Sequence, residues 1–338
     1  MYRIPPEDRG RTGRGVALLC FAVVFCLAAA PPASAGDKFA AEFLKIGVGA
    51  RALGMGGAFA SIADDASAAY WNPAGLVQLR NREAMAMHAS QFGGVESHNF
   101  GSVILPLESA SGRSAIGITA IHLSIDDIRV TTGLKLDDNG DPIYDEGNIT
   151  TKSAYDLALM LSYARDLGDR WSAGVNVKLI RQSLVDAGSS FGIGADLGFL
   201  FRPRPSMSIG LKISDVSTTQ LYWDSGRRET VSPTITLGAH TTSFLRALRG
   251  SITLGVDAAF AFDGLQNADQ FDSGSLSGNL LPGMEYWFRD TVALRLGSDA
   301  GSLTAGAGVR YRQFGVDYAF LDHEELDTTH RVSALYRF

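Results

Sequence analysis

The clearest candidate for metal chemistry is an acidic run over residues 137–142. It reads Asp-Asp-Asn-Gly-Asp-Pro, with side-chain oxygens at alternate positions as in a calcium-binding loop. Pro142 stands where an EF-hand needs glycine, and no glutamate follows at position twelve of such a loop. We therefore interpret Asn139-Gly140 as a polar hairpin turn and predict no metal site.

The other chemistry-bearing side chains form no recognisable catalytic motif. The six histidines are scattered, and only His88 and His98 could meet, through strand pairing. The Ser-x-x-Lys and Gly-x-Ser-x-Gly motifs are absent. An acidic stretch over 322–327 is most simply a solvated loop. We predict that the protein is not an enzyme and holds no cofactor.

The first 35 residues have the features of an export signal. Four arginines precede a 15-residue apolar run over 16–30, and Ala33-Ser-Ala35 supplies the pattern that signal peptidase needs. A membrane-spanning helix needs about 20 apolar residues, so we favour cleavage after Ala35 over a retained anchor. Cys20 and Cys26 both lie in this segment, so the mature chain would have no disulfide or thiolate site.

Charge and hydropathy narrow the class of protein further. Without residues 1–35 the chain holds 26 basic and 34 acidic residues, whereas nucleic-acid binding relies on basic patches. No later apolar run approaches 18 residues, so we expect no transmembrane helix. Hydrophobic residues nevertheless make up 46% of the chain, so they must be distributed periodically.

The period of the apolar residues is two. Segments near 191–202, 251–260 and 304–311 alternate apolar side chains with glycine or polar ones. A strand directs successive side chains to opposite faces, so each segment would have one apolar face. These segments run near ten residues, and aromatic residues stand at their ends as in the girdles of membrane barrels: Tyr163, Trp171, Phe201, Tyr311 and Phe338.

We predict an all-β membrane protein, an antiparallel transmembrane β-barrel over residues 83–338, because lipid cannot satisfy the backbone groups of an open sheet. About fourteen strands are expected, near 83–89, 97–107, 113–123, 151–164, 170–181, 189–202, 206–214, 233–242, 250–261, 279–289, 291–298, 303–312, 314–321 and 329–338. The long connections all fall at one end, as in bacterial outer-membrane barrels with periplasmic termini. Tyr336 and Phe338 resemble the signal read by the barrel-assembly machinery, which would be one partner, with outer-membrane lipid the other.

Residues 36–82 do not alternate, and fourteen strands enclose a lumen that wall side chains alone would not fill. Something should therefore plug the barrel. Five glycines over 47–57 permit close backbone approach. Asp64 or Asp65 could cap a short helix, which Asn72-Pro73 would end.

The run Gly49-Ala-Arg-Ala-Leu-Gly-Met-Gly-Gly-Ala58, followed by Asp64-Asp-Ala-Ser-Ala-Ala-Tyr-Trp-Asn-Pro-Ala-Gly-Leu76, closely resembles the start of the PorV/PorQ family of FadL-like outer-membrane proteins. The resemblance implies that residues 36–82 form a hatch inside the lumen. A purely structural role is the favoured interpretation of Asn72 and Pro73, with gating or ligand contact as the alternative. The residues of the hatch motif are Gly54, Gly56, Gly57, Asp64, Asp65, Asn72, Pro73 and Gly75.

The resemblance leaves two functions open. Resemblance to PorV implies that the protein is a type IX secretion component, which binds the carboxy-terminal domains of cargo and associates with the translocon. Resemblance to FadL-like barrels implies that the protein transports hydrophobic compounds and that the hatch rearranges to open a route. We favour secretion, with Leu221, Tyr222 and Trp223 as an exposed partner-binding loop. A transporter should have an apolar pocket between hatch and wall, whereas a cargo shuttle should have a filled lumen.

Overall fold

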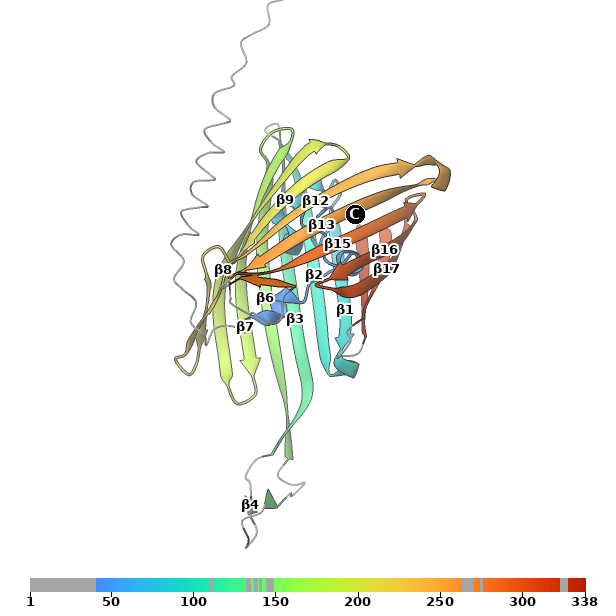
Figure 1. Ribbon diagram of the computed structural model, residues 1–338. Coiled ribbons are helices and arrows are strands. Elements are labelled where there is room, and N and C mark those ends of the chain that lie inside the picture. The colour runs from blue at the N-terminus through green and yellow to red at the C-terminus, as the bar shows by residue number, and fades with distance from the viewer. Residues whose placement is uncertain are drawn as a thin grey trace, which may run out of the picture.

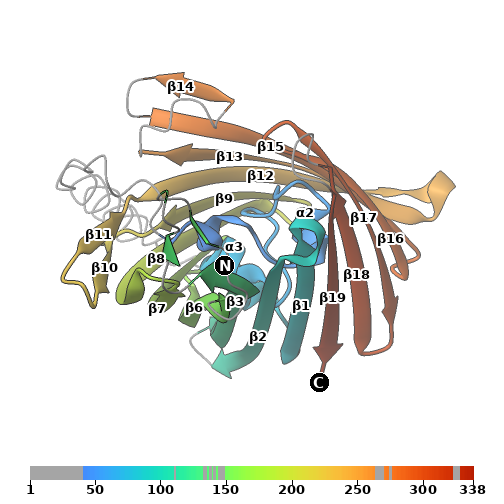
Figure 2. The same cartoon turned by 90° about the horizontal axis from the view of Figure 1, so that it is seen from below.

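Fourteen antiparallel strands form a closed β-barrel (Figures 1 and 2) in the computed structural model, which describes residues 41–109, 112–131, 135–136, 139, 142–143, 149–262, 270–273, 276–322 and 328–338. The predicted antiparallel β-barrel and its strand number are confirmed. Residues 1–40, with the predicted export signal, lie outside the described part. The barrel strands are β1 (Glu83–Gln91), β2 (Glu96–Ser109), β3 (Gly112–Thr131), β6 (Ile149–Asp166), β7 (Trp171–Leu184), β8 (Gly188–Arg204), β9 (Met207–Ser214), β12 (Thr234–Leu245), β13 (Gly250–Ala261), β15 (Leu276–Phe288), β16 (Val292–Asp299), β17 (Ser302–Tyr311), β18 (Phe314–Leu321) and β19 (Thr329–Arg337).

The first and last strands close the ring. β1 pairs with β19 in antiparallel register, from Glu83 opposite Arg337 to Ser90 opposite His330. Each barrel strand therefore has neighbours on both sides, and the sheet has no open edge. We call the end that contains Glu83 and Arg337 the terminal end, and the opposite end the loop end.

The barrel wall is apolar on its outside. Ile118 of β3 and Leu161 of β6 lie opposite each other and are 63% and 58% exposed. Their neighbours Thr119 and Met160 point inward and are buried. A water-soluble sheet would hide such apolar side chains, whereas the hydrocarbon core of a bilayer accommodates them.

Aromatic side chains gather at the terminal end of the outer face. Trp171 stacks on Phe201 with 4.4 Å between ring centroids. Phe314 packs on Tyr336 at 4.9 Å, and Tyr336 stacks on Phe338 at 5.6 Å. Amphipathic and aromatic rings favour the boundary between hydrocarbon and headgroups, so this girdle marks one edge of the apolar belt.

Two connections contain more structure than the sequence predicted, and a third contains the short strand pair that flanks the expected turn. The connection 215–232 forms a hairpin of β10 (Thr219–Trp223) and β11 (Arg228–Val231), and β10 also pairs with β8. β14 (Phe271–Ser273) pairs with β15, and β4 (Lys135–Leu136) pairs with β5 (Pro142–Ile143) around the expected turn. β3 and β6 run past their predicted ends because a bulge after Ile125 lets pairing resume at Ile128.

Helices are few and short. Within the described residues, no helix is long and apolar enough to cross a membrane. Between residue 41 and the first strand there are four helices: η1 (Glu42–Lys45), α2 (Ala50–Leu53), α3 (Ala68–Trp71) and η2 (Pro73–Gln78). Two more, η3 (Phe92–Gly94) and η5 (Arg246–Leu248), form turns between barrel strands.

The outward position of Ile118 predicts a strong effect of charge. Ile118→Arg should lower the free energy of unfolding in lipid vesicles by about 2–4 kcal/mol, because the guanidinium would enter hydrocarbon. Ile149→Arg, on the loop-end extension of β6, should cost about 1 kcal/mol or less. Guanidinium titrations of both variants check this, and equal costs would contradict the membrane position of the belt.

Candidate functional site

Residues 41–82, which we call the inner segment, run through the barrel interior instead of along its wall (Figure 2). Most of their side chains are fully buried. They contact strands on different sides of the ring, since η2 contacts β6, β7 and β8, while α2 contacts β17, β18 and β19. The inner segment is therefore packed between opposite walls.

Small residues on both surfaces permit this close packing. A Cβ added to Gly174 of β7 would overlap the backbone of Pro73, and one added to Gly297 of β16 would overlap that of Met55. Gly56 has a φ of 65°, in the left-handed region that favours glycine, and an added Cβ there would meet the backbone of β16. Larger residues at these positions would push the inner segment off the wall.

Arg51 ties the inner segment to the wall through a buried chain of ion pairs. Its Nε and Nη2 each donate to a carboxylate oxygen of Glu285 on β15 at 2.8 Å. Arg51 Nη1 lies 2.5 Å from Asp64 Oδ1. Glu285 also accepts from Arg295 Nε at 2.7 Å, and Arg295 Nη2 lies 2.9 Å from Asp317. Bidentate pairs of this kind fix orientation as well as charge.

Arg51 stays protonated in this environment. Burial lowers the pKa of Arg51, but the carboxylates of Asp64 and Glu285 outweigh it and raise the pKa well above its ordinary value. The guanidinium therefore keeps its proton and all its ion pairs at any physiological pH.

Two polar side chains hold the turns of the inner segment. Asn72 Nδ2 donates to Ala60 O at 2.7 Å and to Phe199 O of β8 at 3.1 Å. The Oδ1 of Asn72 accepts from Ala74 N at 3.1 Å. Asp257 of β13 accepts from Ala60 N at 2.7 Å. Both amide hydrogens of Asn72 are thus used in joining the inner segment to itself and to the wall.

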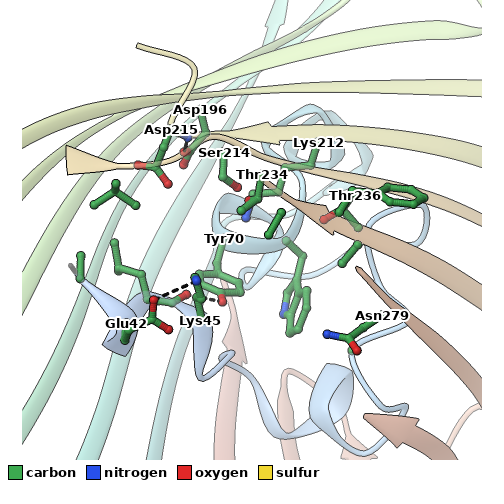
Figure 3. A pocket seen from close by; sticks show the side chains of 18 of the residues that line it. Glu42, Lys45, Tyr70, Asp196, Lys212, Ser214, Asp215, Thr234, Thr236 and Asn279 are labelled. Carbon is green, nitrogen blue, oxygen red and sulfur yellow. Dashed lines mark hydrogen bonds and ion pairs between the residues drawn. The ribbon is translucent and has the colours of Figure 1, made fainter. Parts of the chain in front are cut away.

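A cavity of about 350 Å³ lies between the inner segment and the wall, toward the loop end (Figure 3). Its apolar lining comes from both sides. Leu44, Tyr70 and Trp71 belong to the inner segment, and Met160 and Leu281 belong to the wall. A volume of this order suits a small organic molecule.

One side of the cavity carries charges. Lys178 Nζ lies 2.7 Å from both Asp196 Oδ1 and Asp215 Oδ1, so its charge is neutralised. Lys212 has no salt bridge among the described residues, and its Nζ lies 4.6 Å from the centre of the Tyr70 ring. The cavity therefore has an apolar body and a polar corner that contains an unpaired cation.

Tyr70 connects the apolar and polar parts of the cavity. Its hydroxyl donates to a backbone oxygen of η1 at 2.6 Å. Burial raises the pKa of Tyr70 well above its ordinary value, so the phenol keeps its proton. The ring of Tyr70 also meets that of Trp71 edge-on, with 5.0 Å between centroids.

The eight residues of the predicted hatch motif all lie in the inner segment, but their contacts differ. Asp65 is buried and accepts from Ser67 N at 2.9 Å just before α3, whereas Asp64 is partly exposed beside Arg51. Gly57 is the member of the motif that lines the cavity. The others pack against neighbouring backbone or bond to it: Gly54, Gly56, Asn72, Pro73 and Gly75.

The predicted partner-binding loop is not an exposed loop. Leu221, Tyr222 and Trp223 lie in strand β10. Leu221 is fully buried in the core, whereas Tyr222 is 43% exposed. Because adjacent residues of a strand face opposite ways, the three side chains cannot form one surface.

His88 and His98 do not form a pair, although β1 and β2 are neighbours. His88 is exposed and bonds Asn99 Oδ1 at 2.8 Å, while His98 is buried on the other face. Among the described residues, no group of three His, Cys, Asp or Glu side chains could hold a metal ion. Most of the predicted polar turn over 137–142 lies outside the described residues.

The charged residues of the interior were not predicted from the sequence. Lys178, Lys212, Glu285 and Arg295 occupy inward positions of strands whose outward neighbours are apolar. Their place on the lumen face was predictable from the alternation. Their partners were not, because those come from other strands and from the inner segment.

Glu285 holds two buried arginines, so its loss should be costly. Glu285→Gln should lower the free energy of unfolding by about 3–5 kcal/mol, because Arg51 and Arg295 would lose a shared carboxylate. Asp186→Asn is the matched control, since its pair with Lys152 is exposed and should contribute at most about 1 kcal/mol. Unfolding by urea in detergent measures both, and similar losses would contradict the proposed anchoring.

No family model and no curated protein matches the sequence. Solved structures do match. A Pseudomonas aeruginosa FadL homologue has a TM-score of 0.57 at 13% identity, covering 86% of this chain and 98% of its own. The Ralstonia pickettii toluene transporter TbuX has a TM-score of 0.52 at 16% identity, covering 86% and 98%. The Pseudomonas putida toluene transporter TodX has a TM-score of 0.52 at 12% identity, covering 86% and 96%. The chain therefore has the fold of the FadL-like outer-membrane β-barrels.

Proposed function

We propose that this protein carries small hydrophobic molecules across the outer membrane. The observation that supports this most directly is the cavity between the inner segment and the wall, lined by Leu44, Tyr70 and Trp71 on one side. Lys212 at its polar corner favours a ligand with one polar end. Two proteins of similar fold are toluene transporters, which is consistent with an apolar ligand.

The secretion role has less support. The sequence resemblance to PorV implies binding of cargo and of the type IX translocon, and this remains a prediction. The surface predicted to bind partners, Leu221 to Trp223, is less suited to this role because Leu221 is fully buried. None of the similar structures described above is a secretion component.

The remaining assignments are proposals that complete this function. We propose that residues 1–35 are removed on export, that 36–82 act as a hatch and that 83–338 span the outer membrane. The terminal end would face the periplasm. Tyr336 and Phe338, which point outward, would be read by the assembly machinery during insertion.

Transport requires the inner segment to move. The cavity lies toward the loop end, and the buried residues of the inner segment separate it from the terminal end. Contacts between small residues can separate without exposing large apolar surfaces. The ion pairs of Arg51 would keep α2 in place while the glycine-rich part after it shifts.

Gene deletion distinguishes the two functions. Deletion should lower uptake of a hydrophobic fluorescent dye such as phenylnaphthylamine and leave the set of secreted proteins unchanged. Restoring the gene with Ala259→Phe, which fills the cavity from β13, should leave most of this uptake lost. Ala258→Phe, on the outer face of the same strand, should restore it. A changed secretome with normal dye uptake would favour secretion instead.

A reversible tether tests movement of the inner segment. A Cβ built on Gly255 of β13 would lie 3.7 Å from the Ala58 Cβ, close to the roughly 3.8 Å typical of disulfides. Ala58→Cys with Gly255→Cys should block dye uptake when oxidised and restore it on reduction. Each single variant is the control. Full uptake through the oxidised double variant would mean that the inner segment need not leave β13.

A further inference from the structure

The terminal end of the barrel is rich in exposed arginine. The register of the strands brings the start of β1, the end of β19 and the tight turns together at this end. Among the described residues, nine exposed arginines lie here, against three exposed acids, Glu108, Asp169 and Asp290. No described lysine lies at this end. The nine, which we call the arginine rim, are Arg80, Arg82, Arg165, Arg170, Arg204, Arg246, Arg249, Arg289 and Arg312.

The loop end has no comparable excess of positive charge. Its described, exposed acids are Asp126, Asp127, Asp186, Asp224 and Asp322. Its described, exposed bases are equal in number: Arg129, Lys152, Arg181, Arg227 and Arg228. Among the described residues, the excess of positive charge is thus found at the terminal end and is not a general property of the surface.

Two arginines of the rim, Arg289 and Arg312, adjoin the edge of the apolar belt. The guanidinium of Arg289 lies 5.1 Å from the centre of the Phe288 ring. That of Arg312 lies 5.3 Å from the centre of the Tyr311 ring. Both rings are exposed on the outer face of the barrel. The guanidinium groups of Arg289 and Arg312 therefore lie beside the girdle, at the depth where lipid phosphates meet hydrocarbon.

A hollow at the same end is lined by arginines. It has a volume of about 690 Å³ and is lined by Arg80, Arg113 and Arg202. Asp166 accepts from Arg113 Nε at 3.2 Å and from Arg202 Nη2 at 2.8 Å. Arg113 Nη1 is buried and has no hydrogen-bond partner. Three arginines and two aspartates, Asp166 and Asp169, line the hollow, so it has a small excess of positive charge.

We propose that the arginine rim binds the phosphate groups of anionic phospholipid in the adjoining leaflet. Arginine suits this role because its planar fork donates two parallel hydrogen bonds to a phosphate and also stacks on aromatic rings. The contacts with Phe288 and Tyr311 place the guanidinium groups at the lipid boundary.

Lipid binding at the rim depends on the barrel spanning a bilayer and not on what the cavity carries. It can therefore fail without affecting the transport proposal. It can also hold if the cavity carries nothing.

Native mass spectrometry of the full chain in a neutral detergent tests lipid binding. The protein is mixed with phosphatidylglycerol or with phosphatidylcholine, and bound lipid is counted. The wild type should prefer phosphatidylglycerol by about tenfold. A variant combining Arg246→Gln, Arg249→Gln, Arg289→Gln and Arg312→Gln should lose that preference. These four arginines have no salt bridge among the described residues.

The matched control removes four arginines from the loop end, by Arg129→Gln, Arg181→Gln, Arg227→Gln and Arg228→Gln. It should keep the preference for phosphatidylglycerol. Heat-dependent gel migration checks that both variants are folded. If the rim variant with four substitutions is not folded, the double variant Arg246→Gln with Arg249→Gln replaces it. Equal binding of both lipids by the wild type, or a preference retained by the rim variant, would overturn the proposal. Displacement of the lipid by an equal concentration of inorganic phosphate would also overturn the proposal.

Discussion

A polypeptide backbone in hydrocarbon must place its N–H and C=O groups in hydrogen bonds, because no water is present to receive them. The pairing of β1 with β19 meets this requirement at the one position where the sheet would otherwise be open. The outward apolar side chains, seen at Ile118 and Leu161, are acceptable only because that closure is complete. The even number of strands follows as well, since β1 and β19 are antiparallel neighbours, with the start of β1 and the end of β19 at the same end of the barrel.

Closing fourteen strands creates an interior too wide for the wall side chains to fill. The inner segment occupies that space with small residues, which allow backbone to approach backbone at Gly174 and Gly297. Most described charged groups of the interior lie in ion pairs, because a buried charge without a partner is strongly unfavourable. Lys212, beside the cavity, is one exception. The chain from Arg51 through Glu285 to Arg295 satisfies this condition and also gives the inner segment a fixed position.

The inner segment does not fill the barrel interior completely, and the space that remains is the candidate binding site. The inner segment leaves a cavity where Tyr70 and Trp71 face the wall, and Lys212 adds a cation without an acidic partner. The same segment thus both stabilises the interior and shapes a binding site. The outside has its own asymmetry, because exposed arginine is concentrated at the terminal end, beside the aromatic girdle.

The sequence alone determined the barrel. Alternation along single strands is a local property, so it identified the lipid-facing side chains and nearly all strand positions, from the first at Glu83 to the last at Arg337. It failed where neighbours decide the structure, as in the β10–β11 hairpin that buries Leu221. Tertiary structure alone decided the interior. Register across the ring and the path of the inner segment bring Arg51 to Glu285, 234 positions away, and no local pattern encodes such a meeting.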